Sequence, residues 1–255
     1  MDRTQLLRLL DEVRAGSVAP AEAALRIGEL PYAEVAHAVG SSMIDHHREL
    51  RTGVPEIVFG ASKTAEQIAG TLDELGKRGA AIATRVDPAK AARVAALLPA
   101  VTYHELARLV SVGTSGARPR AAKIAVVCAG TSDLPVAEEA ALVAEWLGAP
   151  VLRVSDVGVA GLHRLLARLE EIRACEVIIA VAGMEAALPS VLGGLTDRPM
   201  IAVPTSVGYG VSVDGLVALG ALLAGCAPGV TVVNIDNGVG AAVAAVKIAR
   251  LASRS

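Results

Sequence analysis

Few residues of this chain have side chains that could do covalent or acid–base chemistry on a ligand. Cys226 stands in the segment Gly-Cys-Ala-Pro-Gly, and Glu185 follows Ala-Gly-Met. A cysteine thiolate is both a nucleophile and a leaving group, and a glutamate can act as a general base. A free cysteine is more often a buried structural thiol, and a glutamate at the start of a helix is electrostatically favourable there. The residue types alone leave both interpretations open.

Most other polar residues that could contact a ligand gather in five short segments. Each follows an apolar run and precedes a helical pattern, at residues 129–135, 155–163, 182–189, 203–210 and 234–238. In a parallel α/β sheet such segments meet at the carboxyl ends of the strands, where ligands bind. We expect one site there, with Cys226 among the loops. Its candidate binding residues are Gly130, Thr131, Ser132, Asp133, Asp156, Gly158, His163, Gly183, Met184, Thr205, Ser206, Tyr209 and Asn237.

The first of these segments, Ala-Gly-Thr-Ser-Asp at 129–133, has the composition of an anion-binding loop. Glycine permits close backbone approach, hydroxyl groups donate hydrogen bonds, and the N-terminus of a following helix attracts negative charge. Ser132 or Asp133 could instead cap that helix. In the second segment, Asp156 could satisfy loop amides and His163 could be a bystander. The clustering of the five segments, rather than any one of them, favours a site.

Strands and helices alternate regularly after residue 121. We expect strands at 123–129, 151–154, 177–182, 200–203 and 231–235, and helices at 134–147, 160–172, 185–194, 212–225 and 238–252. Five strand–helix repeats predict an α/β fold, a doubly wound parallel sheet with helices on both faces. The stretch 215–235 has one apolar half, a Pro-Gly turn and a β-branched half. It predicts a buried helix, a turn and a strand rather than a membrane span.

The first part of the chain is less regular and predicts a smaller mixed α/β domain. Helical patterns cover about 2–15, 20–28, 41–53, 64–79 and 88–98, with strands at 56–59, 80–85 and 101–110. The segment 111–120 is rich in Gly, Ser and Pro and predicts a linker or an exposed loop. We therefore expect an N-terminal domain over residues 1–120 and a second domain, which carries the five segments, over residues 121–255.

Composition limits the class of protein. Of 255 residues, 53% are hydrophobic and only 2% aromatic, which suits buried parallel strands covered by Ala-rich helices. The formal net charge of −2 gives no indication of nucleic acid or an anionic membrane as a partner. The N-terminus lacks the apolar core of a signal peptide, and three widely spaced cysteines argue against a disulfide framework. We expect a soluble cytoplasmic protein that acts on small molecules.

Longer motifs show a family resemblance. In chain order they are DHHRELRTGVPEIVFGASKT, AGTSDLPVAEEA, DVGVAGLHRL, VAGMEAALPSVLGGL, VPTSVGYG and CAPGVTVVNIDNG. Over residues 41–253 the chain resembles the LarB family of pyridinium-3,5-biscarboxylic acid mononucleotide synthases. That family is related to the PurE carboxylases and mutases of purine synthesis. The resemblance implies a PurE-like fold for the second domain.

The resemblance also implies a reaction. Nicotinic acid adenine dinucleotide and carbon dioxide would give the biscarboxylic acid mononucleotide and AMP, the first step of nickel-pincer nucleotide cofactor biosynthesis. Cys226 matches the nucleophile of the family and Glu185 its acidic residue, our candidate base; Thr131, Ser132 and Asp133 match the nucleotide-binding loop. Mg²⁺ would assist phosphoanhydride hydrolysis, although the sequence identifies no metal ligands. The family further implies a homo-oligomer, octameric or dimer-based, and no organic cofactor.

Two other functions stay open at this point. A PurE-type aminoimidazole ribonucleotide carboxylase or mutase would need neither the N-terminal half nor Cys226, and its Ala-His-Arg motif is absent here. A non-catalytic nucleotide-binding sensor would leave Cys226 and Glu185 incidental. The chain also departs from the family at residues 60–64, where Gly-Ala-Ser-Lys-Thr replaces an expected Gly-Glu-Gly-Lys-Thr. That difference affects local contacts of the N-terminal domain rather than the reaction.

Overall fold

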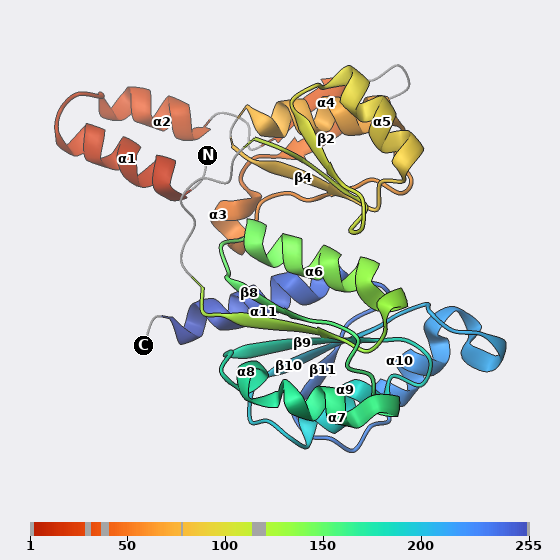
Figure 1. The fold of residues 1–255 in the computed structure, drawn as a ribbon. Coiled ribbons are helices and arrows are strands. Elements are labelled where there is room, and N and C mark those ends of the chain that lie inside the picture. The colour runs from red at the N-terminus through yellow and green to blue at the C-terminus, as the bar shows by residue number, and fades with distance from the viewer. Residues whose placement is uncertain (1–2, 29–31, 37–40, 78, 114–120, 254–255) are drawn as a thin grey trace. The chain divides into compact units, whose positions relative to one another are not determined.

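The structure is a computed structural model that describes residues 3–28, 32–36, 41–77, 79–113 and 121–253. The chain divides into two compact units, an N-terminal unit (Met1–Gly116) and a C-terminal unit (Ala117–Ser255). Both units contain helices and strands (Figure 1), which agrees with the predicted fold class. The domain boundary that we predict after residue 120 lies outside the described residues.

Five parallel strands form the sheet of the C-terminal unit, in the order β11-β10-β9-β7-β8. They are β7 (Ile124–Cys128), β8 (Val151–Val154), β9 (Val177–Ala182), β10 (Met200–Pro204) and β11 (Val230–Val232). Every residue of β7, β9 and β10 is buried, as expected for runs of Val, Ile and Ala in a parallel sheet. The predicted parallel sheet is confirmed.

Helices cover both faces of this sheet (Figure 1). On one face, α6 (Leu134–Trp146) packs against α11 (Gly238–Ala252), and fully buried alanines such as Ala144 and Ala245 permit the close approach of the two helices. The other face is covered by α7 (Leu162–Ala167), α8 (Leu169–Arg173), α9 (Ala187–Gly193) and α10 (Leu216–Leu223). The core therefore lies on both faces of the sheet. The connecting loops leave the sheet at the carboxyl ends and at the amino ends of the strands, called its carboxyl edge and its amino edge below.

The chain reverses its direction of travel across the sheet between β7 and β9. From β7 it passes to β8 at one edge, then returns to β9 on the other side of β7 and continues to β10 and β11. Ligands of doubly wound sheets bind at such a switch point, outside the carboxyl ends of the strands. The loops that follow β7 and β9 therefore flank the expected position of a ligand.

The N-terminal unit has its own sheet, in the order β3-β4-β6-β5. Its strands are β3 (Val58–Phe59), β4 (Ala81–Thr84), β5 (Val101–His104) and β6 (Leu109–Val112), covered by α4 (Ala65–Gly76) and α5 (Pro88–Leu97). A capping box of Thr64 and Gln67 begins α4, and Asp87 caps α5. The single strand that we predict over 101–110 is wrong, because Arg108 turns the chain with a φ of 48° and makes a hairpin of β5 and β6.

The start of the chain departs further from the prediction. After α1 (Arg3–Arg14) and α2 (Pro20–Gly28), β1 (Tyr32–Ala36) pairs antiparallel with β2 (Ser41–Asp45), and the helix α3 covers only Arg48–Thr52. The expected helix over 41–53 is therefore wrong in its first half. The charged run after residue 44 has helical periodicity, but burial of Ile44 and the pairing with β1 favour a strand before it.

The uncharged stretch 215–235 forms α10, a turn and β11, as the sequence predicts. The helix that we predict over 212–225 is shorter, because its start is the 3₁₀ segment η3 (Gly210–Gly215). Two other 3₁₀ turns, η1 (Thr131–Asp133) and η2 (Val159–Gly161), precede α6 and α7. In the described part of the chain, no helix combines the length and apolarity that a membrane span requires.

Candidate functional site

The first and fourth predicted segments are joined by a buried hydrogen bond. Thr205 Oγ1 donates to Asp133 Oδ1 at 2.7 Å, and the backbone N–H of Gly130 donates to Asp133 Oδ2 at 2.9 Å. Asp133 is only 4% exposed and Thr205 is fully buried. Because both carboxylate oxygens already accept bonds from the protein, Asp133 is suited to hold two loops together. We had predicted direct substrate contact for Asp133 and Thr205, and the geometry favours this supporting role instead.

The third and fourth segments are held equally closely. The N–H of Met184 donates to the carbonyl oxygen of Val207 at 2.9 Å. A Cβ on Gly183 would lie 2.4 Å from that same oxygen and 2.6 Å from Thr205 Oγ1, so only glycine fits there. The predicted importance of Gly183 therefore has a steric cause.

Glu185 lies exposed between two residues with left-handed backbone conformation. Met184 has a φ of 55° and Ala186 a φ of 50°. Such conformations cost about 1–3 kcal/mol each in residues other than glycine and are concentrated at functional sites. The N–H of Ala186 donates to the carbonyl oxygen of Gly183 at 2.8 Å, which closes the turn. The loop therefore presents Glu185 to solvent at the carboxyl edge of β9.

Asp236 joins the fourth and fifth segments and was missed by the sequence analysis. Its Oδ1 accepts from the N–H of Ser206 at 2.8 Å, and its own N–H donates to the carbonyl oxygen of Pro204 at 2.9 Å. Asn237, which we predicted to contact substrate, accepts from the N–H of Gly240 at 2.8 Å and caps α11. Asp-Asn-Gly before a helix is a capping signal, so this role could have been anticipated.

The second segment contacts the first through its backbone. The N–H of Gly158 donates to the carbonyl oxygen of Ala129 at 2.8 Å, and a Cβ on Gly158 would approach that oxygen to 3.0 Å. Asp156, with a φ of 57°, forms an ion pair with Arg164. His163 is exposed on α7.

Arg164 is the second residue that the sequence analysis missed. The five segments contain no Lys or Arg, and Arg164 directly follows one of them. Its Nε is buried and has no hydrogen-bond partner among the described residues. The signal that could have found it is electrostatic, because an anionic ligand at acidic loops requires a cation.

Several predicted residues remain available to a ligand at this edge. The exposed ones are Thr131, Ser132, Asp156, His163, Met184, Glu185, Ser206 and Tyr209. Hydrogen bonds link the segments in the pairs first–second, first–fourth, third–fourth and fourth–fifth. The structure therefore brings the five segments together, as predicted, into one continuous polar edge.

Cys226 does not lie at this edge, which corrects our expectation for its position. It precedes β11, and the first residue of β11, Val230, is level with Met200 at the start of β10. The neighbouring Ala227 lies beside the last residue of α9, since a Cβ on Gly193 would be 3.0 Å from the Cβ of Ala227. Cys226 is therefore near the amino edge of the sheet. Its closeness to Asn237 in sequence is misleading, because β11 separates the two.

The three thiols have different surroundings. Cys128 and Cys175 are buried, as predicted, whereas Cys226 is exposed. Burial raises the pKa of the Cys128 thiol and that of the Cys175 thiol, which keeps both protonated and unreactive. Of the three, only Cys226 is accessible to a ligand.

The described residues include no group of three or more His, Cys, Asp or Glu side chains that could hold a metal ion. The Mg²⁺ that the resemblance implies therefore stays an expectation, with no ligands assigned to it among those residues.

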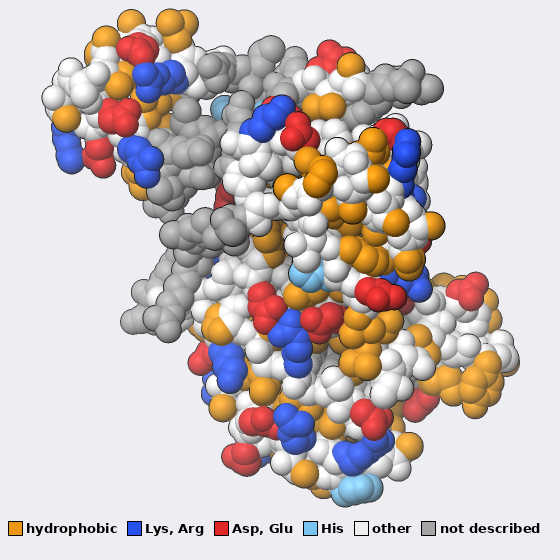
Figure 2. Space-filling model, turned by 45° about the horizontal axis from the view of Figure 1, so that its top comes forward, with side chains coloured by type: hydrophobic (Ala, Val, Ile, Leu, Met, Phe, Trp, Pro, Cys, Tyr) orange, Lys and Arg blue, Asp and Glu red, His pale blue; other side chains and the backbone are white. Residues whose placement is uncertain are grey.

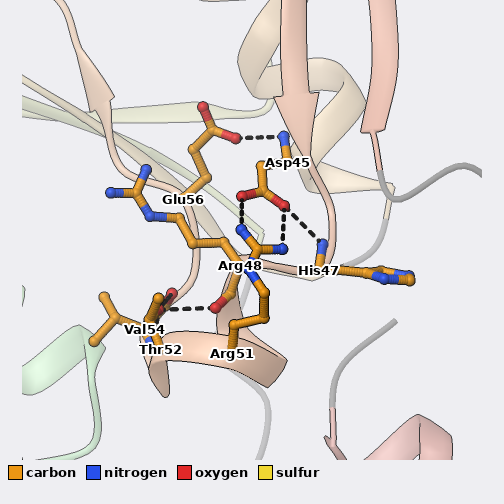
Figure 3. A network of polar contacts seen from close by, with 7 residues as sticks. All are labelled: Asp45, His47, Arg48, Arg51, Thr52, Val54 and Glu56. Atoms are coloured by element: carbon orange, nitrogen blue, oxygen red, sulfur yellow. Dashed lines mark hydrogen bonds and ion pairs between the residues drawn. The ribbon is translucent and has the colours of Figure 1, made fainter.

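The N-terminal unit contains a separate polar network, in the motif that begins at Asp45 (Figure 3). Arg51 donates to both oxygens of Asp45, at 2.6 and 3.2 Å, and the N–H of His47 donates to Oδ1 at 3.2 Å. The Asp45 N–H donates to Glu56 at 2.7 Å. The hydrogen bond from Arg51 holds the pKa of Asp45 below its usual value. These groups bind one another, so the network supports the fold rather than a ligand.

Known proteins resemble both units. The sequence profile of AIR carboxylase matches residues 123–255, and that of the LarB/PurE-like N-terminal domain matches residues 36–114. An uncharacterized protein of Methanocaldococcus jannaschii is 38% identical over 222 residues, which are 82% of this chain and 84% of that protein.

Proteins named as mutases cover less of the chain. The N5-carboxyaminoimidazole ribonucleotide mutase of Methanocaldococcus jannaschii is 37% identical over 133 residues, 50% of this chain and 79% of the mutase. That of Pyrococcus horikoshii is 34% identical over 131 residues, 49% of this chain and 71% of the mutase. The likeness to the mutases therefore spans about half of the chain, whereas the uncharacterized relative extends over both units.

Proposed function

Since the chain belongs to the LarB family of AIR carboxylase-related enzymes, we propose that it carboxylates the pyridinium ring of nicotinic acid adenine dinucleotide and cleaves the dinucleotide to release AMP. The observation that carries this proposal is the presence of the LarB/PurE-like N-terminal domain before the AIR carboxylase domain. The mutase relatives align over only half of this chain. A mutase function would leave that additional domain and Cys226 without a role.

The proposed chemistry needs a nucleophile because a pyridinium ring is electrophilic and does not attack carbon dioxide. Addition of the Cys226 thiolate to ring carbon 4 makes an enamine whose carbon 5 forms the new C–C bond to carbon dioxide. Glu185 then takes the proton from carbon 5, and departure of the thiolate restores the pyridinium ring. Water finally cleaves the phosphoanhydride to give the mononucleotide and AMP.

The exposed residues of the carboxyl edge support this assignment. Thr131 and Ser132 lie in η1 before α6, where hydroxyls and a helix N-terminus suit a phosphate. Arg164 is the nearest cation in sequence to any of the five segments and would pair with an anionic group of the substrate in exchange for Asp156. Glu185 lies in the loop after β9, beside the switch point of the sheet.

Mass spectrometry tests the proposed reaction most directly. The purified protein, incubated with nicotinic acid adenine dinucleotide, bicarbonate and magnesium, should form AMP and a mononucleotide with one additional carboxylate. Formation of a product from N5-carboxyaminoimidazole ribonucleotide, with the dinucleotide untouched, would establish the mutase alternative. Binding and unchanged release of the dinucleotide would establish a sensor.

Substitutions separate the two catalytic residues. Cys226→Ala should abolish carboxylation and leave dinucleotide binding largely intact, and turnover in that variant would sink the thiol mechanism. Glu185→Gln should accumulate a thiol adduct, detected by intact-protein mass. The matched control is Glu170→Gln, which changes an exposed glutamate of α8 and should leave turnover unchanged.

We further propose that the enzyme is a homo-oligomer and works in the cytoplasm. The support for assembly is the apolar surface of residues 206–229, where Tyr209 is 81%, Val211 82% and Leu223 69% exposed. A sedimentation or light-scattering measurement of the full chain gives its mass in solution.

A further inference from the structure

The sheet of the N-terminal unit has an edge where β3 and β4 end side by side. Phe59, the last residue of β3, is level with Thr84, the last residue of β4, in a parallel pair. The turn before β6 reaches the same edge, because the carbonyl oxygen of Arg108 accepts from the N–H of Val86 at 2.8 Å. We call residues 59–63, 85–90 and 105–108 the N-terminal edge. Ligands of α/β sheets bind where parallel strands lead into helices, and the proposed reaction makes no use of this edge.

The loops of the N-terminal edge are held in one arrangement. Lys90 Nζ donates to the carbonyl oxygens of Gly60 and Ala61, at 3.0 Å each. The N–H of Gly60 donates to the carbonyl oxygen of Thr84 at 2.8 Å. A Cβ on Gly60 would lie 2.8 Å from that same oxygen, so only glycine allows the two loops to pack this closely. Such a preformed surface loses little conformational freedom when a ligand binds.

An exposed aromatic ring and a guanidinium group lie together at the N-terminal edge. Phe59 is 50% exposed, and the guanidinium carbon of Arg85 is 5.7 Å from the centre of its ring. Leu106, in the turn before β6, is 49% exposed. Figure 2 shows hydrophobic side chains beside Lys and Arg on the N-terminal unit. Nucleic-acid bases stack on exposed aromatic rings and on guanidinium planes, so this edge suits a base.

Two arginines of the edge occupy backbone positions that favour glycine. Arg85 has a φ of 56° and Arg108 a φ of 48°. Left-handed backbone costs free energy in residues other than glycine, and it persists mainly at functional sites. Glycine would remove this cost, so arginine at both positions indicates a use for the two side chains.

Positive charge exceeds negative charge at the N-terminal edge. Four cations and two carboxylates lie on its loops and on the first turn of α5: Lys63, Arg85, Lys90, Arg108, Asp87 and Glu105. Asp87 is already engaged, since its Oδ1 accepts from the N–H of Lys90 at 2.8 Å. Lys63 and Arg108 form no ion pair within the described part of the chain. These two cations are therefore available to an anionic group such as a phosphate.

The loops of the C-terminal unit offer little positive charge for comparison. Their five segments contain no Lys or Arg, and Arg164 directly follows one of them. The proposed substrate is a dinucleotide, whose two linked phosphates both carry negative charge. The mutase relatives are named for a single ribonucleotide, and they match only about half of this chain. The additional unit thus accompanies the additional nucleotide of the proposed substrate.

We propose that the N-terminal edge binds an adenosine 5′-phosphate group. The base would stack on Phe59 and Arg85, and the phosphate would pair with Lys63 and Arg108. The choice of adenylate rests on the proposed function, in which this group has two sources, the dinucleotide substrate and the released AMP. All residues of the site belong to the N-terminal unit.

Calorimetric titration of the full chain with AMP tests the contacts. Phe59→Ala should weaken binding about tenfold, because the base loses its stacking surface. Lys63→Gln should weaken it by a similar factor and make the affinity less dependent on salt, because the phosphate loses a charged partner. The matched controls Leu97→Ala and Arg93→Gln change exposed side chains of α5 and should bind AMP like wild type. Wild-type affinity in both Phe59→Ala and Lys63→Gln would overturn the proposal.

Photolabelling locates the site without any substitution. The full chain is irradiated with 8-azidoadenosine 5′-monophosphate, and the labelled peptides are identified by mass spectrometry. Labels should appear on peptides that contain residues 59–63 or 85–90, and an excess of AMP should prevent them. Labels confined to the C-terminal unit, or no label that AMP prevents, would overturn the proposal.

Steady-state kinetics distinguishes the two sources of the adenylate. If the edge binds this part of the dinucleotide, Phe59→Ala should raise the KM for the dinucleotide about tenfold and leave kcat nearly unchanged. If the edge binds free AMP, the KM should stay the same and inhibition by added AMP should be about tenfold weaker in that variant. A variant with unchanged KM and unchanged inhibition would count against both sources and overturn the proposal.

Binding and labelling do not require turnover, so they also separate this inference from the proposed function. A chain that is labelled at the N-terminal edge but does not convert the dinucleotide refutes the proposed function alone. A chain that converts the dinucleotide but is labelled only in the C-terminal unit refutes this inference alone.

Discussion

The carboxyl-edge loops and the apolar surface of residues 206–229 share Ser206, yet their side chains are satisfied in different ways. The loops satisfy their polar groups within one chain, through bonds such as Thr205 to Asp133 and Ser206 to Asp236. The segment leaves large apolar side chains such as Val211 and Leu223 exposed. The loops are therefore satisfied by contacts within the chain, whereas residues 206–229 present an apolar surface.

The largest expected difference is in the reactivity of the cysteine thiols. A small alkylating reagent should modify Cys226 in the native protein, while Cys128 and Cys175 react only when the structure opens. Opening of a stable core costs more than about 4 kcal/mol, so their rates should be at least about 1,000-fold lower. Peptide mass spectrometry after timed labelling measures all three. Equal labelling would show that the C-terminal unit is not packed as described.

A pair of glycine substitutions compares the regions by stability. Gly183→Ala places a Cβ 2.4 Å from a backbone oxygen and should destabilise the C-terminal unit by about 3 kcal/mol. Gly220→Ala, in α10 with nothing within 4 Å of the new Cβ, should instead stabilise by about 0.5–1 kcal/mol. Urea denaturation gives both values. A destabilising Gly220→Ala would indicate that a second copy already packs there.

Threonine substitutions test the bond that joins the first and fourth loops. Thr205→Val keeps the shape but removes the donor to Asp133, which leaves a buried carboxylate oxygen without its partner. We expect a loss of about 2 kcal/mol in the free energy of unfolding. Thr231→Val, at an exposed position of β11, is the control and should change stability by less than about 0.5 kcal/mol. Equal effects of the two substitutions on the free energy of unfolding would show that the bond between Thr205 and Asp133 does not stabilise the C-terminal unit.

A smaller effect is expected at Arg164, where the polar edge would contact the substrate. Arg164→Gln should raise the KM for the dinucleotide about tenfold and change kcat little, because the cation acts on binding. Arg168→Gln removes a cation paired with Glu171 on the same side of the sheet and should leave KM unchanged. A KM effect of equal size in both variants would indicate general electrostatics rather than a contact.

The smallest effect on stability is expected from a substitution of Asp45 in the N-terminal unit. The polar groups of its network bind one another, as those of the carboxyl-edge loops do. The pKa of Asp45 is lowered by Arg51, so its contribution to stability is present above the unfolded pKa, about 3.9. That contribution is lost as the pH falls through the folded value. Asp45→Asn should therefore be slightly less stable than wild type at pH 7, with a difference that shrinks below pH about 4. Thermal unfolding at a series of pH values measures it.

The sheet of the C-terminal unit could be predicted because its strands are short apolar runs separated by Gly-rich, polar segments. Runs such as residues 177–182 admit few alternatives once five of them alternate with helical patterns. The segment Ser41–Asp45 was harder to predict, because the charged run that follows it has helical spacing. Only the pairing with β1 makes this segment a strand. Pairing with a distant segment leaves no local signal.

The sequence predicts which loops form the site, but it does not predict the role of each residue within them. Glu185 and the exposed hydroxyls follow strands directly, so topology alone places them at one edge. Asp133 and Asn237 have the residue types of ligand contacts and of caps alike, and their hydrogen bonds decide between these. Cys226 was assigned to the wrong edge because the three residues of β11 place it and the following loop at opposite ends of a strand.

The bond between Thr205 and Asp133 also has a consequence for the order of folding during synthesis. The two residues are 72 positions apart in the chain. Thr205 directly follows β10, which pairs with β9, and β9 in turn pairs with β7, the strand that precedes the loop of Asp133. Contacts of such long sequence separation form late, because the intervening chain must first be ordered. A ribosome that has released the first loop, Ala-Gly-Thr-Ser-Asp, must therefore add some seventy residues before that loop can be locked. An unfinished chain therefore lacks the assembled loops of the carboxyl edge.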